Sequence, residues 1–300
     1  MQQSSLTLYE FKNLFLDENA CRKHLFEIRW PNGFECPKCG HTEYYEIESR
    51  NIFQCTNCRH QTSVTAGTIF HKTRTPLQIW FWIIFLVAKD KRGVSALSIS
   101  KEFPVSYPTA WTMLHKIRKA MSDRDSNYQL SGIIEVDEGY FGASTKGKKR
   151  GRGTDQSKVL VSVSVKQDSK PQFAKMNIIN DITKDTIHEN IKSNIEKDST
   201  INTDGFRSYS GLNENGFNHE KIESLDLDIT EVLKSVHTLI SNVKSFIEGT
   251  YHGLDKKHLQ SYLDEYCYRF NRRFWQNQLF DRLLTACINI RAITYAELTL

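Results

Sequence analysis

Closely spaced cysteines constrain the fold of this 300-residue chain more than any other feature. Four of its seven cysteines form two C-x-x-C turns: Cys36, Cys39, Cys55 and Cys58. Each turn directs two thiolates toward one point, and two such turns complete the tetrahedral ligand set of a zinc ion. Residues 44–47 and 50–54 predict a short hairpin between the turns. We therefore expect a zinc ribbon over residues 31–70, with one structural zinc that has no open coordination position.

Composition and length argue against a membrane-spanning protein and against a secreted one. The length suits two or three modest domains. The longest apolar stretch, Ile79–Ala88, is shorter than the roughly 18 residues of a membrane span, and the first residues do not resemble a secretory signal. An intracellular protein is therefore expected, in which the three scattered cysteines do not form a disulfide framework. A net charge of +5 fits a nucleic-acid partner without requiring one.

Helical patterns flank the expected ribbon, as a lead-in over residues 1–30 and as a module over residues 75–125. Thr75-Pro76 is typical of a helix start, and Ser106 is the expected N-cap of a later helix. That helix has an apolar stripe at helical spacing: Ala110, Leu114, Ile117 and Met121. Its opposite side carries the candidate DNA-binding residues Thr109, Thr112, Lys116 and Lys119. The pattern indicates a helix-turn-helix-like DNA-binding module; the alternative is a helical bundle with a solvated basic face.

Carboxylates interrupt an apolar, strand-forming run in the segment GIIEVDEGYFG. Because side chains alternate along a strand, Glu135 and Asp137 share one face. Ile134, Val136 and Glu138 share the other. Burying a carboxylate without a partner is costly, and a magnesium ion compensates for that cost because it prefers oxygen ligands. The alternative is an edge strand whose acids face solvent.

A second acid, Asp204 in TINTDGFRSYSG, lies at the expected carboxyl end of a short strand. Between Asp137 and Asp204 the chain predicts two strands and a helix: Val159–Val165, Gln172–Ile179 and Thr183–Glu196. This order is that of an RNase H-like core, in which the first and fourth strands are neighbours. The expected fold class is therefore multidomain, with the zinc ribbon, the helical module, an α/β RNase H-like core at 130–275 and C-terminal helices at 276–300.

Basic residues gather in a Gly-rich run just after the first acidic strand: Lys146, Lys148, Lys149, Arg150 and Arg152. In this place they could reach a DNA backbone; the alternative is a solvated loop. Further along, three arginines alternate with aromatic residues that predict a helical core stripe: Arg269, Arg272 and Arg273. Contact with DNA or with a partner subunit is one interpretation of these arginines.

The chain resembles insertion-sequence transposases of the ISXO2-like type. Beyond the ribbon, the resemblance rests on five segments: SALSISKEFPVSYPTAWTMLHKIR, EVDEGYFG, TDGFRSYSGL, VHTLISNVKSFIEGTYHGL and HLQSYLDEYCYRFNRRF. It implies a DDE-type nuclease core that uses a pair of magnesium or manganese ions to cut double-stranded DNA at the insertion-sequence ends and join the 3′ ends to target DNA. It also implies a bacterial, cytoplasmic and nucleoid-associated protein that acts on DNA as a homo-oligomer.

Position by position, the resemblance assigns Asp137 and Asp204 to the first and second catalytic aspartates, which also bind magnesium. It assigns Asn242 to the third catalytic position, where the family carries an acid or an asparagine. An asparagine offers one neutral oxygen there, so the two aspartates would carry most of the charge. Two other functions remain open: a DNA-binding relative that has lost catalysis, and a nuclease that cuts without joining.

Other polar residues near these positions have two interpretations. Glu135 either supports the metal site or pairs with a local Lys or Arg, and Glu138 is expected to face away. Lys244 is the one lysine close to Asn242 that could match the family's lysine beyond the third residue. His237 and His252 flank Asn242 along the chain and are expected to be structural.

Overall fold

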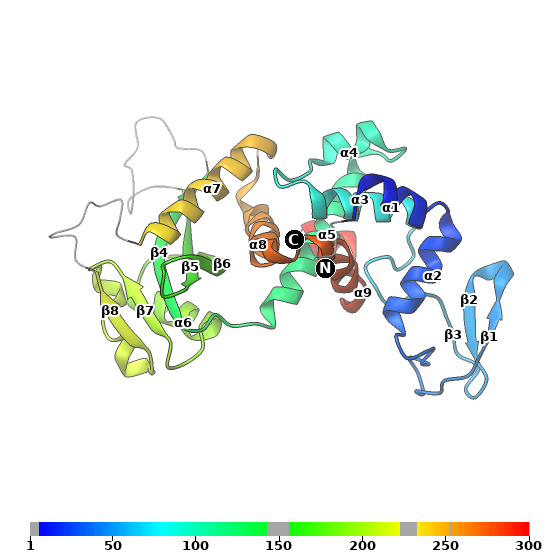
Figure 1. The fold of residues 1–300 in the computed structure, drawn as a ribbon, viewed down its shortest axis with the longest axis horizontal. Coiled ribbons are helices and arrows are strands. Elements are labelled where there is room, and N and C mark those ends of the chain that lie inside the picture. The colour runs from blue at the N-terminus through cyan, green and yellow to red at the C-terminus, as the bar shows by residue number, and fades with distance from the viewer. Residues whose placement is uncertain (1–5, 143–155, 223–232, 253, 300) are drawn as a thin grey trace. The chain divides into compact units, whose positions relative to one another are not determined.

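The chain forms two compact units, which are drawn in Figure 1. The first comprises residues 1–124 with 275–300, and the second comprises residues 125–274. This computed structural model describes four stretches of the chain: 6–142, 156–222, 233–252 and 254–299. Among the described residues, no helix is long and apolar enough to cross a membrane.

The first unit contains the ribbon strands and most of the helices. Its elements are α1 (Leu8–Leu14), α2 (Glu18–Arg29), β1 (Tyr44–Ile47), β2 (Ile52–Cys55), β3 (Gln61–Thr62), α3 (Leu77–Lys89), α4 (Ala96–Glu102), α5 (Tyr107–Ser126, whose last two residues belong to the second unit), α9 (Leu279–Asn289) and α10 (Tyr295–Thr299). Strands β1, β2 and β3 form an antiparallel sheet in that order, which confirms the expected hairpin.

Aromatic rings join the start of the chain to its end in the core of this unit. The ring of Phe280 on α9 lies 5.3 Å from that of Phe11 on α1 and 5.9 Å from that of Phe81 on α3. Helix α3 is buried almost all round, as its apolar sequence predicts. The residues after 275, which the sequence predicts as C-terminal helices, therefore complete the core of the first unit.

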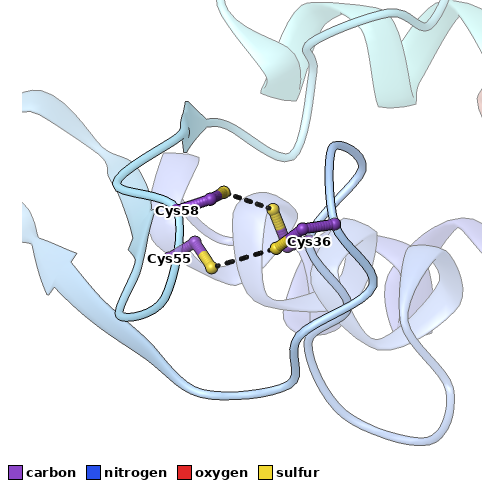
Figure 2. A group of neighbouring side chains, drawn as sticks. Cys36, Cys55 and Cys58 are labelled. Atoms are coloured by element: carbon purple, nitrogen blue, oxygen red, sulfur yellow. Dashed lines mark hydrogen bonds between the residues drawn. The ribbon is translucent and has the colours of Figure 1, made fainter.

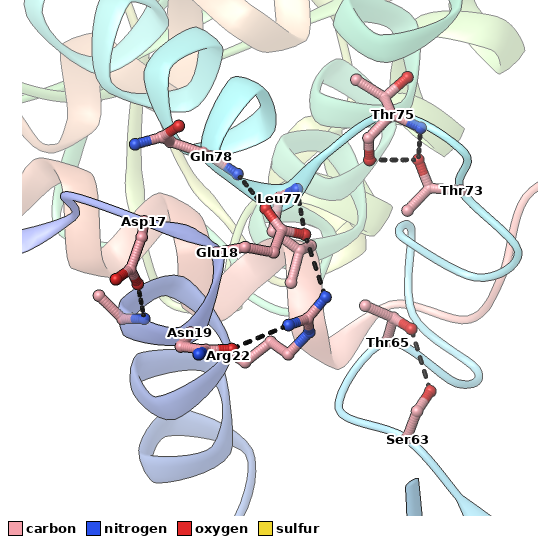
Figure 3. Close-up of polar contacts among 11 residues, drawn as sticks. Asp17, Glu18, Asn19, Arg22, Ser63, Thr65, Thr73, Thr75, Leu77 and Gln78 are labelled. Carbon is pink, nitrogen blue, oxygen red and sulfur yellow. Dashed lines mark hydrogen bonds and ion pairs between the residues drawn. The ribbon is translucent and has the colours of Figure 1, made fainter. Parts of the chain in front are cut away.

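The N-terminus of α3 is capped from another helix rather than from its own sequence. Pro76 occupies the N-cap position and makes no side-chain cap bond. Thr75 is therefore not the N-cap residue that the Thr75-Pro76 pattern predicted. Instead, the Glu18 carboxylate accepts hydrogen bonds from the backbone N–H groups of Leu77 (2.9 Å) and Gln78 (3.1 Å), as Figure 3 shows. A carboxylate suits this position because the first N–H groups of a helix lack intrahelical partners and attract negative charge.

A mixed sheet of five strands organises the second unit. Its elements are β4 (Ile133–Phe141), β5 (Ser157–Val165), β6 (Pro171–Ile179), α6 (Lys184–Asn194), β7 (Thr200–Thr203), β8 (Asn218–Lys221), α7 (Lys234–Thr250) and α8 (Leu259–Asn271). The strand order is β6-β5-β4-β7-β8, with β4, β5 and β6 antiparallel and β4, β7 and β8 parallel. The first and fourth strands are neighbours, as expected of an RNase H-like core. The acidic strand β4 is central, so the edge-strand alternative is wrong.

The two faces of the sheet carry separate hydrophobic clusters. One face holds Ile134 and Val136 of β4 with α6 and Tyr209. The other holds Phe141 of β4 with residues of α7 and α8, including Leu239 and Leu263. Odd-numbered side chains of β4 therefore point toward α7 and even-numbered ones toward α6, which confirms the predicted alternation.

The arginines at the end of α8 make contacts inside the second unit. Arg272 forms a 2.7 Å ion pair with Asp125 and lies 3.6 Å over the ring of Tyr268. Arg273 donates to the carbonyl oxygen of Gln172 at 2.8 Å, and Arg269 pairs with Glu265 at 3.3 Å. These contacts attach α8 to its surroundings, so each arginine already has a structural role.

Candidate functional site

The four cysteines of the C-x-x-C turns converge on one point. The Sγ atoms of Cys36 and Cys58 are 3.6 Å apart, as are those of Cys39 and Cys55 (Figure 2). All four sulfurs lie within 4.8 Å of one another. Four thiolates bound to one zinc at about 2.3 Å are separated by about 3.8 Å, so the quartet has the size of a tetrahedral zinc site.

Backbone geometry explains why the two turns can aim their sulfurs together. Gly40 after the first turn and Arg59 after the second both have positive φ, at 74° and 59°. Their N–H groups donate back to the carbonyl oxygens of Cys36 (2.9 Å) and Cys55 (3.1 Å). Each turn therefore closes on itself before the chain leaves, which holds the ligands in place.

Two aspartates come together through the pairing of β4 with β7. In this parallel pair Glu135 lies opposite Asn202, and Asp137 and Asp204 each follow two residues later. Asp137 therefore lies on the central strand next to the carboxyl end of β7, where Asp204 follows Thr203. The carboxyl ends of parallel strands meet at one edge, which is where α/β sheets commonly bind ligands.

Backbone N–H groups orient both carboxylates. The Oδ1 atom of Asp137 accepts from the N–H of Glu138 at 2.8 Å, and that of Asp204 accepts from the N–H of Phe206 at 3.0 Å. The side chain of Asp137 is 16% exposed. Two carboxylates in a partly enclosed position suit a hard divalent cation such as magnesium or manganese. Among the described residues, the cysteine quartet is the one group of three or more His, Cys, Asp or Glu residues whose ligand atoms lie close enough to share a metal ion.

Glu138 points to the opposite face of the sheet, as expected, and there it meets a residue that the sequence reasoning missed. The hydroxyl of the fully buried Tyr209 donates to Oε1 of Glu138 at 2.7 Å. Burial raises the pKa of Tyr209 well above its ordinary value, and the negative charges of Glu138, Asp137 and Asp204 raise it further. Tyr209 therefore stays neutral, and it is close enough to Asp137 and Asp204 for their negative charges to affect its pKa. The motif TDGFRSYSG contained this residue, but no local pattern indicated its partner.

Helix α7 packs along β4 and contacts it at more than one point. Oε2 of Glu135 accepts hydrogen bonds from the backbone N–H groups of Ser235 (2.9 Å) and Val236 (3.1 Å) in the first turn of α7. Further along, a Cβ on Gly139 would lie 2.7 Å from the ring of Phe141 and 3.4 Å from the Ile240 side chain of α7, so the Phe141 ring is what excludes a larger residue there. Glu135 thus binds backbone N–H groups of α7, whereas one of its two interpretations from the sequence was a pair with a local Lys or Arg.

Replacing Glu135 should loosen α7. Glu135→Ala removes a carboxylate that is 7% exposed and leaves two N–H groups without their acceptor. We expect the free energy of unfolding of the second unit to fall by about 1–3 kcal/mol. Glu135→Gln retains an acceptor oxygen and should lose less. Urea denaturation monitored by circular dichroism measures both, and equal losses in the two variants would contradict a hydrogen-bonding role.

The α7 side chain that the structure brings to Asp137 is His237, whose Nδ1 lies 3.7 Å from Oδ2 of Asp137. Lys244 is on the same flank of the helix, with Nζ 5.7 Å from the ring centroid of Phe141. Asn242 is exposed. At about 100° per residue it points roughly 140° away from His237 around the helix. The structure therefore brings Asp137, Asp204 and His237 to one end of the sheet and puts Asn242 on the other flank of α7.

The candidate DNA-binding residues of α5 have contacts within the first unit. Ser106 caps the helix as expected, since its hydroxyl accepts from the N–H of Thr109 at 3.4 Å and is 2.9 Å from the Thr109 hydroxyl. Thr112 donates to the Pro108 carbonyl oxygen at 2.8 Å. Lys119 forms a 3.1 Å ion pair with Asp123.

Lys116 is half-buried, and its ammonium donates to the carbonyl oxygen of Ile69 at 3.2 Å. Burial lowers the pKa of this group. The predicted apolar stripe of α5 is buried, and so are Met113, His115 and Arg118 beside it. The exposed residues of α5 are Tyr107 and Pro108 at its N-terminus and Lys119, Asp123, Arg124 and Ser126 toward its C-terminus. The basic run Lys146, Lys148, Lys149, Arg150 and Arg152 lies outside the described residues.

Solved structures similar to this chain include two complexes of the Mos1 transposase. One is the Mos1 strand transfer complex, at 12% identity and a TM-score of 0.29, covering 69% of this chain and 77% of that chain. The other is a paired-end complex with the left transposon end, at 10% identity and a TM-score of 0.23, covering 70% and 79%.

Sequence comparisons identify two domains in the chain. The chain matches a transposase zinc-ribbon domain over residues 16–61 and an ISXO2-like transposase domain over residues 129–271. It is 26% identical over 217 residues to the "uncharacterized protein in transposable element ISH50" of Halobacterium salinarum, a match that covers 67% of this chain and 71% of that protein. The chain therefore carries a transposase zinc ribbon followed by an ISXO2-like transposase domain.

Proposed function

We propose that this chain is an active DNA transposase that binds the ends of its insertion sequence, cuts the DNA and joins the 3′ ends to a target. The observation that carries the proposal is the parallel pairing of β4 with β7, which brings Asp137 and Asp204 to one end of the sheet. In the proposal these two aspartates are the metal ligands of the catalytic centre. The resemblance adds Asn242, which is exposed on α7, as the third catalytic residue.

The protein groups around this centre hold the carboxylates in position. The N–H groups of Glu138 and Phe206 each fix one oxygen, Oδ1, of Asp137 and Asp204 respectively. Divalent metal ions, when bound, supply positive charge for an in-line displacement at phosphorus. Water and a DNA 3′-hydroxyl can both act as the attacking group in one such site, so cleavage and joining need no covalent protein intermediate. The buried negative charge of Glu138, held by Tyr209, adds to the field that favours cation binding.

DNA binding is proposed for the basic run after β4 and for the helical module. A helix-turn-helix reads bases with the N-terminal residues of its second helix, and the exposed start of α5, with Thr109 and Thr112, is suited to that role. Helix α4 precedes it across a short turn at 103–106. Lys119 can contribute charge at the surface, whereas the half-buried Lys116 is the weakest candidate of the four.

Removing charge from the basic run should weaken DNA binding in a way that depends on salt. For Lys148→Ala combined with Lys149→Ala, we expect the slope of log K against log salt concentration to fall by about 1.8, because each lost phosphate contact contributes about 0.9. Lys170→Ala is the matched control, since Lys170 is an exposed lysine paired with Asp168. Fluorescence anisotropy at several salt concentrations measures the slopes, and an unchanged slope would assign the run to a solvated loop.

The proposed activity is tested with a supercoiled plasmid that carries both ends of the insertion sequence and with the zinc-loaded full chain. We expect cleavage at the ends and joined products when magnesium or manganese is present, and neither when EDTA is added. Cleavage without joining would favour the nuclease alternative. Binding without cleavage would favour a DNA-binding relative that has lost catalysis. Because joining needs both ends, we also propose a homo-oligomer on DNA, which analytical ultracentrifugation of the DNA complex can measure.

A further inference from the structure

We infer that Tyr209 is a positioning residue of the proposed metal centre, which holds the backbone segments that carry Asp137 and Asp204 in one fixed arrangement. This inference rests on the proposed function, because it concerns the same two aspartates. The observation behind it is a continuous chain of hydrogen bonds that leads from one aspartate to the other through Tyr209. Tyr209 is fully buried, so it acts through its neighbours and not by touching a metal ion or DNA.

The first half of this chain of hydrogen bonds runs from Asp137 to Tyr209 through Glu138. The N–H of Glu138 donates to Oδ1 of Asp137 at 2.8 Å. Oε1 of the same glutamate accepts from the Tyr209 hydroxyl at 2.7 Å. Because neighbouring side chains of a strand point to opposite faces, Glu138 links the carboxylate on one face of the sheet to the phenol on the other.

The second half runs from Tyr209 to Asp204 through Phe206. The N–H of Tyr209 donates to the carbonyl oxygen of Phe206 at 3.1 Å, and the N–H of Phe206 donates to Oδ1 of Asp204 at 3.0 Å. Tyr209 ends a short 3₁₀-helix, Arg207–Tyr209. Its hydroxyl therefore ties this helix, and with it the loop that begins at Asp204, to the central strand β4.

The backbone ladder between β4 and β7 does not extend to the two aspartates. Its last paired residues are Glu135 and Asn202, which lie two residues before Asp137 and Asp204. The relative position of the two carboxylates therefore depends on contacts beyond the ladder. The link through Tyr209 is a contact of this kind, because it joins β4 to the loop after β7 directly beside both aspartates.

The surroundings of Glu138 favour a role in geometry over a role in stability. Glu138 is 7% exposed and shares its face of β4 with the buried Ile134 and Val136. Replacing buried ionic groups by apolar residues of similar volume is often neutral or stabilising, so packing alone does not require a carboxylate there. A buried hydrogen-bond network instead fixes the geometry of the groups that it joins.

The test is Mn²⁺ binding to the zinc-loaded full chain, measured by electron paramagnetic resonance. Tyr209→Phe removes the hydroxyl and keeps the ring in the core. We expect the Mn²⁺ affinity to fall by about tenfold or more, because groups that orient metal ligands have effects of this size. Glu138→Gln keeps an acceptor for the hydroxyl and should lose less. The matched control is Tyr251→Phe, which removes another phenol that donates to a buried carboxylate, Glu265, at 3.3 Å; it should bind Mn²⁺ as wild type does.

A second measurement needs no divalent metal at the aspartates. In Tyr209→Phe we expect faster hydrogen exchange at the N–H groups of Phe206 and Tyr209, with the protection of β5 unchanged. Exchange measured by mass spectrometry compares the two segments in the same sample. An equal loss of protection in β5 would show that the phenol supports the whole fold of the second unit, and it would contradict the inference.

The outcomes separate this inference from the proposed function. If Asp137→Asn weakens Mn²⁺ binding but Tyr209→Phe does not, Tyr209 is not a positioning residue and the aspartate site stands. An equal loss of affinity in Glu138→Gln would assign the effect to the charge of Glu138, and an equal loss in Tyr251→Phe would assign it to general destabilisation; either would overturn the inference. If Asp137→Asn leaves Mn²⁺ binding unchanged, the proposed metal centre itself is wrong.

Discussion

Asp137→Asn is expected to reduce DNA cleavage by about 10³-fold or more, which corresponds to roughly 4 kcal/mol of transition-state stabilisation. The amide keeps the shape of the side chain and can still accept from the N–H of Glu138, so the fold should persist. What it removes is the negative charge that binds a cation on the central strand. Asp204→Asn should have a similar effect, because its carboxylate lies at the end of the neighbouring strand. Gel analysis of plasmid cleavage measures both variants.

The matched control is Glu189→Gln, which removes a carboxylate that is exposed on α6, on the other side of the sheet. It should cleave at the wild-type rate. DNA binding by Asp137→Asn should also match wild type, because the expected DNA contacts lie elsewhere. Cleavage at a normal rate by either aspartate variant would show that the catalytic centre has been placed wrongly.

Removing zinc should unfold the ribbon and leave the second unit folded. Structural zinc contributes about 10–16 kcal/mol of apparent binding energy in small zinc domains, which exceeds what the three short strands can supply. In Cys36→Ser, or after chelation, we expect loss of hydrogen-exchange protection over β1–β3, with protection retained in β4 and β5. Exchange measured by mass spectrometry distinguishes these regions.

The effect should extend into α2, because aromatic rings join the ribbon to that helix. The ring of Phe53 on β2 lies 5.1 Å from that of Phe26 and 5.7 Å from that of Trp30. Cys21→Ala, a change of a buried cysteine outside the quartet, serves as the control and should retain one zinc per chain. If the ribbon contributes to DNA recognition, Cys36→Ser should also bind the insertion-sequence ends more weakly. Unchanged binding would assign the ribbon another role.

Local sequence patterns were sufficient to predict those features of this protein that depend on residues close together in the chain. The C-x-x-C spacing predicts the zinc quartet, because each turn sets the direction of its own two sulfurs. Alternation along GIIEVDEGYFG predicts which side chains of β4 share a face, because the pleat of a strand is local too. The order of strands and helix after β4 predicts the topology in which β4 and β7 are neighbours.

Other features depended on contacts between residues far apart in the chain, and only the tertiary structure decided them. Glu18 caps α3, and Glu135 anchors the first turn of α7. The rotation of α7 about its axis follows from the packing of Val236, Leu239 and Val243 on the sheet, and His237 Nδ1 comes within 3.7 Å of Asp137. A one-residue shift in a helix turns a side chain by about 100°, so a motif can identify the helix of a site without identifying the residue that faces it.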